Sequence, residues 1–211
     1  MKKLIPLLLI ALFLVSCEKE PDLSKVQNDY VIYTQYDKDS NFSKGNTFYI
    51  ADSVLLIGNK DKGITFLNNS TSDFIIDTYT NQMISRGYTP SENKEDATYG
   101  LQISYIESTY YYVNNSSWWS DYPWYWTPSY WWPWYTGYWY YPFPFIYSYT
   151  SGSLIAEMID LTTISINMTN QKPRIIWNNY ITDIDIPSTS KIKLANAISQ
   201  AFTQSPYISY K

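Results

Sequence analysis

A dense run of aromatic residues at positions 110–149 constrains this 211-residue chain more than any other feature. Of these 40 positions, 22 are aromatic, and Asp121 is the one charged residue among them. Five prolines interrupt the run, namely Pro123, Pro128, Pro133, Pro142 and Pro144. Because proline lacks an amide hydrogen and fixes φ, this stretch can form neither a long helix nor a central strand. The sequence therefore predicts an irregular, proline-broken insertion over residues 109–151.

The aromatic side chains of this insertion form more apolar surface than a soluble monomer leaves exposed, so they must be buried or take part in binding. Each buries about 150–250 Å², and together they far exceed the apolar patch of about 300–600 Å² that a monomer tolerates. Four interpretations stay open: a hydrophobic lid on a sheet, a protein-contact surface, a platform that stacks on glycan rings, and a segment that enters the membrane interface. The candidate contact surface is formed by Trp118, Trp119, Trp124, Trp126, Trp131, Trp132, Trp134 and Trp139.

Outside the insertion, most of the chain shows strand patterns separated by polar turns. Runs of β-branched and aromatic residues, or apolar and polar residues in alternation, predict strands. We expect them at residues 30–36, from 47, at 101–105, at 154–166 and at 174–181. The alternation in 101–105 predicts a half-buried strand, and residues 58–70 are expected to form a loop.

Two amphipathic segments predict helices. The first covers 72–86, with Ser70 at its start, Asp73 in its first turn and Gly87 just beyond its end. Its inward residues are expected to include Ile75 and Tyr79.

The second helix is expected at 189–203, ending before Pro206. Its inward face is predicted to consist of Ile192, Ala195, Ile198 and Phe202. The element order is then β-β-α-β-insert-β-β-α. This order predicts an α+β fold: a two-layer sandwich of a mostly antiparallel sheet with both helices on one face, to which Ile103 and Trp177 contribute from the sheet.

The N-terminus resembles a secretion signal. Lys2 and Lys3 precede an apolar run at 4–15, which is shorter than the ~20 residues of a membrane-spanning helix. The run ends in Leu14-Val15-Ser16-Cys17, which resembles the lipobox of bacterial lipoproteins. That resemblance implies cleavage before Cys17 and acylation of its thiol and new amine, so that the acyl chains hold the protein to a membrane.

These signals divide the chain into three parts. Residues 1–16 are a lipoprotein signal peptide, 17–28 are a polar, lipidated tether, and 29–206 are a single α+β domain that contains the insertion. A chain of this length fits one domain. Cleavage would leave a net charge of −6, so the acyl chains rather than a basic patch would bind the membrane.

Composition excludes several classes of function. The chain has no histidine and one cysteine, which excludes a Ser-His-Asp relay, histidine ligation of a metal and a thiolate zinc site. The net charge of −4 argues against nucleic-acid binding, which requires a basic face. We therefore expect no catalytic residue, no metal site, no cofactor and no nucleic-acid partner.

Two acidic patterns are considered as sites and set aside. Residues 37–41 resemble the opening of a calcium loop, but Phe42 and Phe48 stand where an EF-hand needs glycine and glutamate, so a turn is expected there. Glu157 and Asp160 are three positions apart, an odd spacing, on one predicted strand. This spacing places them on opposite faces, which excludes a paired glycosidase site.

Several short pieces follow one another in order along the mature chain: Tyr36-Asp37, Asn41-Phe42-Ser43-Lys44, Thr47-Phe48-Tyr49, Ser85-Arg86-Gly87-Tyr88, Asp96-Ala97, Gly152-Ser153-Leu154, Ile159-Asp160 and Ile175-Ile176-Trp177. Their order and spacing resemble the bacterial envelope lipoproteins of domain-of-unknown-function family four-one-three-six. The gap from Gly152 to Trp177 is longer than this family leads us to expect, which predicts an extended hairpin or an extra turn. The resemblance implies an α+β envelope domain, with no known activity and no established catalytic residues.

Together these features favour a membrane-anchored envelope lipoprotein that acts as a non-enzymatic accessory or protein-binding module. Two alternatives stay open: glycan binding through the Tyr/Trp-rich segment, and a carboxylate-dependent envelope hydrolase. The expected partners are the membrane, through the acyl chains, and an envelope protein or a glycan. The expected location is the outer membrane of a Gram-negative bacterium, which Glu18 after the cysteine favours by analogy with lipoprotein sorting.

Overall fold

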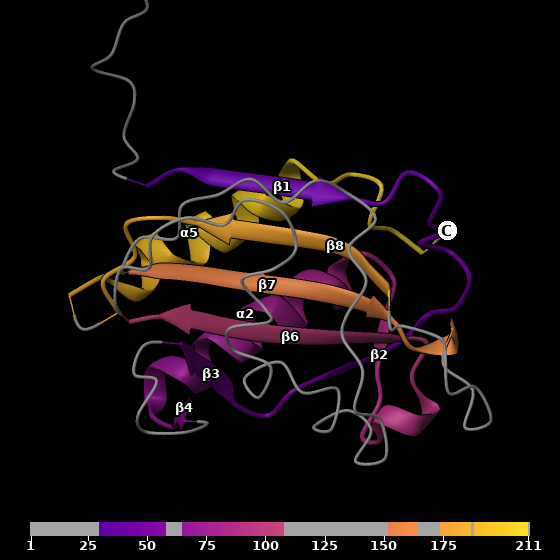
Figure 1. Cartoon of the computed structure of the whole chain (residues 1–211), viewed down its shortest axis with the longest axis horizontal. Helices are drawn as coiled ribbons and strands as arrows, with labels where there is room; N and C mark the ends of the chain where they lie inside the picture. The colour runs from indigo at the N-terminus through magenta and orange to yellow at the C-terminus, as the bar shows by residue number, and fades with distance from the viewer. Residues whose placement is uncertain (1–29, 58–64, 108–151, 164–173, 187, 211) are drawn as a thin grey trace, which may run out of the picture.

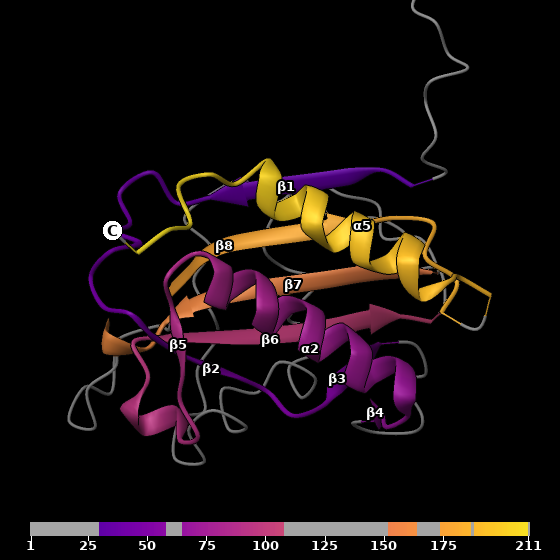
Figure 2. The ribbon, with the colours of Figure 1, turned by 180° about the vertical axis from the view of Figure 1, so that it is seen from behind.

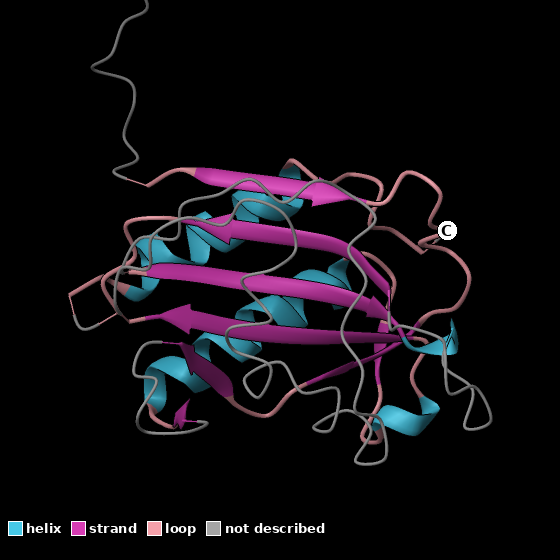
Figure 3. Cartoon of the chain, in the orientation of Figure 1, coloured by secondary structure: helices cyan, strands magenta, loops and turns pink. Residues whose placement is uncertain are grey.

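The structure is a computed structural model that describes residues 30–57, 65–107, 152–163, 174–186 and 188–210. Within them, eight strands form one sheet, and two α-helices lie side by side on one of its faces (Figures 1 and 2). Most of the long strand pairs are antiparallel. The predicted α+β sandwich, with its mostly antiparallel sheet and its helices on one face, is therefore confirmed (Figure 3).

The strands of the sheet are β1 (Ile32–Tyr36), β2 (Thr47–Ile50), β3 (Val54–Ile57), β4 (Thr65–Leu67), β5 (Thr89–Pro90), β6 (Tyr99–Ile106), β7 (Ser153–Asp160) and β8 (Arg174–Ile181). Their order in space is β1-β8-β7-β6-β2-β5, with β3 also beside β6 and β4 beyond β3. The predicted strand at 174–181 coincides with β8. The predicted strand at 154–166 ends early, because β7 passes at residue 160 into a 3₁₀ turn (Leu161–Thr163).

The N-terminal half of the sheet departs from a simple antiparallel pattern. Both β2 and β3 pair in parallel with β6. The two short strands lie one after the other along β6, β2 beside its first half and β3 beside its second half. β3 also forms a hairpin-like pair with β4. The predicted loop at 58–70 is therefore wrong at Thr65–Leu67, where β4 forms.

Helix α2 (Ser70–Ser85) begins two residues earlier than predicted. Its N-cap is Asn69 rather than Ser70, because the Asn69 side chain accepts hydrogen bonds from the amides of Thr71 and Ser72. The Asn69 amide in turn donates a hydrogen bond to the Ser72 hydroxyl at 3.0 Å, which completes a capping box. Gly87 follows the helix with φ of +91°, as its predicted position after the helix requires.

Helix α5 (Lys191–Thr203) has a different inward face from the predicted one. Ile198 and Phe202 are fully buried as predicted, but Ile192 is 76% exposed and that prediction is wrong. The inward stripe consists of Leu194, Ala197, Ile198, Ala201 and Phe202. This stripe follows the i, i+3, i+4, i+7, i+8 spacing of a helix that packs on a sheet, and its alanines allow a close approach.

The main core lies between the helices and the sheet. Tyr79 and Met83 of α2 and Phe202 of α5 have no exposed surface, and they belong to the same buried cluster as Ile103 and Trp177 of the sheet. Trp177 packs against Phe202 with ring centroids 5.3 Å apart.

The central strands are buried on both faces, not on one. All eight residues of β6 are buried, including Gln102 and Ser104 on the face away from the helices. The prediction that 101–105 is a half-buried strand is therefore wrong. The alternation of apolar and polar residues is real, but its polar side is covered as well.

Candidate functional site

The sheet face that points away from the helices carries the candidate site. On β8, Trp177 packs on Phe202, and the Asn179 side chain hydrogen-bonds the Tyr79 hydroxyl, so both residues face the helices. Because side chains alternate along a strand, Asn178 points to the opposite face. Figure 1 looks onto this face, and Figure 2 looks onto the helices.

The strand register aligns Asn178 with three other polar residues. Gln35 on β1 and Glu157 on β7 lie opposite Asn178, and Gln102 on β6 lies opposite Glu157. These four residues form a continuous line across four neighbouring strands. We call this line the polar row (Gln35, Asn178, Glu157 and Gln102).

The polar row is buried along most of its length. Glu157 has no exposed surface, Asn178 and Gln102 are also buried, and Gln35 at the β1 end is partly exposed. In the described part of the chain, the side-chain atoms Asn178 Nδ2 and Gln35 Oε1 have no hydrogen-bond partner, and the same holds for Ser104 Oγ on β6. A buried polar atom without a partner costs about 1–3 kcal/mol. Such atoms are uncommon enough that their concentration on one sheet face calls for a functional or structural reason.

The chemistry of the polar row suits recognition by hydrogen bonds. Carboxamides donate and accept, whereas an ionised carboxylate only accepts. Directly opposed residues on neighbouring strands have Cβ atoms about 4.5–5.5 Å apart, so Asn178 and Gln102 flank Glu157 within reach of each other's side chains. The row can therefore hold hydroxyl or amide groups, and it contains one carboxylate rather than a pair.

Two tyrosines lie beside the row at its β1 end. Tyr33 and Tyr180 oppose each other in the strand register, and their rings are stacked with centroids 6.2 Å apart. Tyr33 is 44% exposed, whereas Tyr180 is buried and receives a hydrogen bond from Ser153 Oγ. An exposed flat ring next to amide groups is a surface that can stack and hydrogen-bond at once.

The border of the sheet formed by β1 is the other candidate site. Among the described strands, β1 is the last on its side of the sheet, and every residue in it is at least partly exposed. The opposite border is formed by two shorter strands, β5, which has two residues and ends in Pro90, and β4, which has three residues and lies beyond β3. β1 therefore provides the longer strand edge of the two.

Comparison with known proteins places the chain in a family. The model named Domain of unknown function (DUF4136) matches residues 32–207. A solved DUF4136 family protein from Bacteroides thetaiotaomicron VPI-5482 is 39% identical and superposes with a TM-score of 0.76, covering 87% of this chain and 100% of that one. The chain belongs to the DUF4136 family.

Two other comparisons add little to this DUF4136 assignment. A PelC dodecamer structure from Paraburkholderia phytofirmans is 10% identical, covers 86% of this chain and 99% of that one, and has a TM-score of 0.37, too low to support a shared fold. A comparison with curated proteins gives no match. The predicted family resemblance is confirmed, and the family itself has no known function.

Most of the predicted site residues of this DUF4136 chain lie outside the described residues. They include Cys17, the tryptophans of 118–139 and the whole insertion 109–151. Of the two acidic residues considered for catalysis, Glu157 lies in the polar row. Asp160 pairs instead with Lys44 at 3.2 Å and accepts a hydrogen bond from the Thr162 amide.

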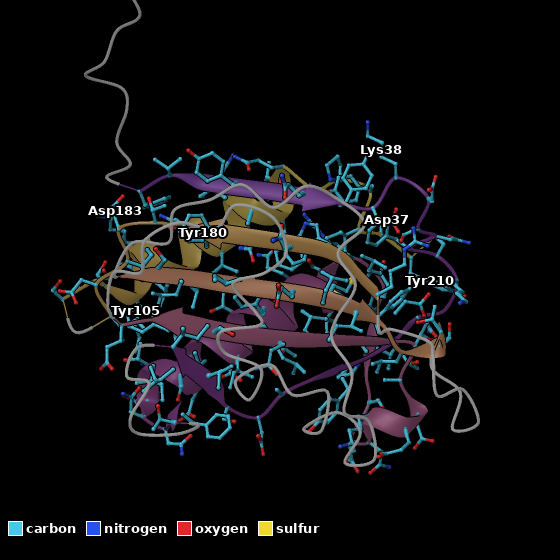
Figure 4. The ribbon with its side chains drawn as sticks, viewed as in Figure 1. Asp37, Lys38, Tyr105, Tyr180, Asp183 and Tyr210 are labelled. Atoms are coloured by element: carbon cyan, nitrogen blue, oxygen red, sulfur yellow. The ribbon has the colours of Figure 1, made fainter. Side chains whose placement is uncertain are left out.

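Residues 37–41 form a turn between β1 and β2, as predicted. The Asp37 carboxylate accepts hydrogen bonds from the Asp39 amide and the Ser40 hydroxyl, and it forms an ion pair with Arg174. Asp37 and Lys38 lie at the C-terminal end of β1 (Figure 4). Asp37 thus stabilises the turn and ties β1 to the start of β8.

The sequence did not reveal the polar row. Asparagine is depleted in strands, so Asn178 is visible as an exception. Only the pairing of four strands shows that it aligns with Gln35, Glu157 and Gln102. In the described residues, no group of histidine, cysteine, aspartate or glutamate is arranged to hold a metal ion. No helix in that part of the chain is long and apolar enough to cross a membrane.

Proposed function

We propose that this DUF4136 protein is a lipid-anchored, non-enzymatic module of the bacterial cell envelope that works by binding another envelope component. The supporting observation is the place where the chain enters the domain. The predicted lipobox cysteine Cys17 is followed by a polar stretch, and β1, the first described strand after it, has no further strand beside it in the described part of the sheet. The anchor would hold the protein at the membrane, and the border next to the tether would be available to a partner.

The anchoring half of the proposal is tested with Cys17→Ala, using Ser16→Ala as the matched control because lipobox positions before the cysteine accept small residues. Cys17→Ala is expected to release the protein from the membrane fraction or to leave an uncleaved precursor. Ser16→Ala is expected to stay membrane-bound. Normal processing and membrane partitioning of Cys17→Ala would contradict the proposal.

A second candidate function is recognition of an envelope glycan. It is favoured by the exposed ring of Tyr33 beside the amide of Gln35, since flat rings stack on sugar faces and carboxamides hydrogen-bond hydroxyl groups. In this candidate the β1 end of the polar row contacts the sugar, and Gln35 Oε1, which has no hydrogen-bond partner among the described residues, is the acceptor available to a hydroxyl group.

Glycan binding is tested by retention of the purified protein on immobilised peptidoglycan and on envelope polysaccharide. Tyr33→Ala is expected to lose retention at least tenfold, whereas Tyr210→Ala, an exposed tyrosine near the C-terminus, is expected to bind like the parent (Figure 4). Equal retention of both variants would contradict glycan binding at this site. Turnover of the glycan by the purified protein would contradict a non-enzymatic role.

A further inference from the structure

We propose that two copies of this chain associate edge to edge through β1, in an antiparallel β1–β1 pair that joins their sheets. This inference rests on the binding role proposed above and names the partner as a second copy of the same chain. Three features of β1 support this pairing: the direction of its backbone groups, its composition and its symmetry.

The hydrogen-bonding pattern shows which backbone groups of β1 point outward. The Thr182 amide donates to the Val31 carbonyl at 2.9 Å, and the Asp37 amide donates to the Ile176 carbonyl at 2.9 Å. In an antiparallel ladder such bonded pairs occur at every second residue. The odd-numbered residues of β1 therefore bond to β8, and the even-numbered residues direct their amide and carbonyl groups away from it.

These outward groups belong to Ile32, Thr34 and Tyr36. Within the described residues, no backbone hydrogen bond from another element reaches them, and no strand lies beyond β1. They form a row of alternating donors and acceptors that a further strand could pair with.

β1 lacks the devices that usually protect such an edge. Natural edge strands are shortened, charged, bulged or interrupted by proline. Ile32–Tyr36 contains no charged residue and no proline, and its pairing with β8 is regular over all five residues. Val31 and Tyr33 also leave large apolar side chains exposed at this border, at 48% and 44%. On the opposite border, by contrast, β4 has three residues and β5 has two and ends in Pro90.

The strand is complementary to itself about Thr34. If Thr34 lies opposite its own copy, Ile32 lies opposite Tyr36, and all three outward residues become hydrogen-bonded pairs. Each outward amide then meets an outward carbonyl, so none of these groups is left without a partner. Threonine opposite threonine is itself a favourable cross-strand pair.

The charges in and next to β1 leave its centre free of like-charge contacts. Within positions 30–38 the charged residues are Asp37 and Lys38. Asp37 is already paired with Arg174, and the two-fold register places it opposite Val31. The same register places Lys38 opposite Tyr30, over whose ring the Lys193 amino group lies at 5.8 Å. Lys38 and Lys193 therefore approach each other at the two ends of the pair, and none of the residues Ile32–Tyr36 meets a like charge.

A single cysteine at the symmetry point tests this geometry in the full, membrane-bound chain. Thr34→Cys would bring two thiols together at a Cα separation of about 5.5 Å, inside the range of about 4.4–6.8 Å that a disulfide needs. Gln35→Cys is the matched control, because its copies would be about 8 Å apart, two residues out of register. The unsubstituted chain reports any dimer that forms through Cys17.

Oxidation is expected to convert most of Thr34→Cys to a disulfide dimer, and to leave Gln35→Cys and the unsubstituted chain as monomers on non-reducing gels. Equal cross-linking of Thr34→Cys and Gln35→Cys, or none in Thr34→Cys, would overturn the proposal.

A second variant removes the pairing itself. Thr34→Pro deletes an outward amide without touching the bonds of β1 to β8, and prolines are accepted on edge strands at such positions. The native-state mass of the detergent-solubilised chain is expected to fall from dimer to monomer, with the far-ultraviolet circular dichroism unchanged. A folded Thr34→Pro that remains dimeric would overturn the proposal, and if Thr34→Pro unfolds, Thr34→Lys is read by the same criteria.

Self-association and membrane anchoring are separable in this design. Thr34→Pro is expected to remain in the membrane fraction, whereas Cys17→Ala is expected to leave it. If the parent protein partitions with membranes but is monomeric, only the β1 pairing is overturned. If it is dimeric but does not partition with membranes, only the lipid anchor is overturned.

Discussion

The hydroxyl of Tyr79 and the side-chain amide of Asn179 meet inside the core, where Asn179 Nδ2 donates to the tyrosine oxygen at 3.0 Å. Neither residue has exposed surface. The same asparagine accepts a hydrogen bond from the Ala156 amide through Oδ1. One side chain therefore links helix α2 to two neighbouring strands.

Removing the Tyr79 hydroxyl is expected to destabilise the fold. In Tyr79→Phe the Asn179 amide keeps its place but loses its acceptor, and a buried donor without a partner costs about 1–3 kcal/mol. The free energy of unfolding, measured by urea denaturation, should fall by that amount. Tyr210→Phe, at an exposed tyrosine, should change it by less than about 0.5 kcal/mol. An equal effect of the two substitutions would show that the buried hydrogen bond contributes nothing.

Stability is expected to decrease in alkaline solution. Burial raises the pKa of Tyr79 and Tyr88 above the ordinary value of 10.0, and burial likewise raises the pKa of Tyr99. Above pH 10 the unfolded chain loses these phenolic protons and the folded chain retains them, so the free energy of unfolding falls as the pH rises. Below pH 10 both states are protonated, and these groups add no pH dependence.

This alkaline effect is measured by thermal unfolding between pH 8 and 12, with tyrosinate absorbance recorded at each pH. Tyr88→Phe should reduce the steepness of the decline above pH 10. Tyrosinate absorbance that rises fully before any loss of structure would contradict the assignment, because the buried phenols would then ionise in the folded state.

Phe202 and Ile192 of α5 were both predicted to face inward, and only Phe202 does. Replacing them by alanine should therefore lower the free energy of unfolding by very different amounts. Phe202 is fully buried against Trp177, so Phe202→Ala should cost about 3–5 kcal/mol. Ile192 is 76% exposed, so Ile192→Ala should change stability by no more than about 0.5 kcal/mol. Guanidinium denaturation of both variants checks the register of α5, and a reversed order would mean that the helix is rotated.

Gly87 should be intolerant of any side chain. Its φ of +91° is a conformation that L-residues adopt at a cost of about 1–2 kcal/mol. A Cβ atom there would also lie 2.8 Å from the carbonyl oxygen of Tyr210. Gly87→Ala should lower the melting temperature and loosen the C-terminal residues, as measured by calorimetry and amide exchange, whereas Ser85→Ala on the same exposed turn should be neutral.

Local patterns in the sequence were enough to predict the parts of the fold that local physics determines. β8 coincides with its predicted range because isoleucine and aromatic residues, which favour strands, fill five of its eight positions. Helix α2 was found through its periodicity and Gly87, and its start was misplaced because Asn69 and Ser70 are equally good caps. The inward face of α5 was misassigned because apolar residues recur at helical spacing from Ile192 as well as from Leu194, and both series include Ile198 and Phe202.

Features that depend on distant residues could not be predicted. The parallel pairing of β2 and β3 with β6 is set by partners more than 45 positions away in the chain. The polar row depends on the alignment of four strands, so Gln35 and Glu157 carry no local sign of belonging together. The burial of Gln102 and Ser104 also escaped prediction, since alternation indicates two faces but not what lies over each.

The pairing of β1 with β8 determines when the fold can be completed. Tyr36 pairs with Trp177 and Ile32 with Ile181, so the first strand of the domain finds its neighbour only near the end of the chain. A chain made from its N-terminus must therefore hold β1 without a partner until about 140 further residues have been synthesised. Such long-range closure slows folding. During that interval β1 lacks its native neighbour, and an unpaired strand of this kind is prone to pair with other chains.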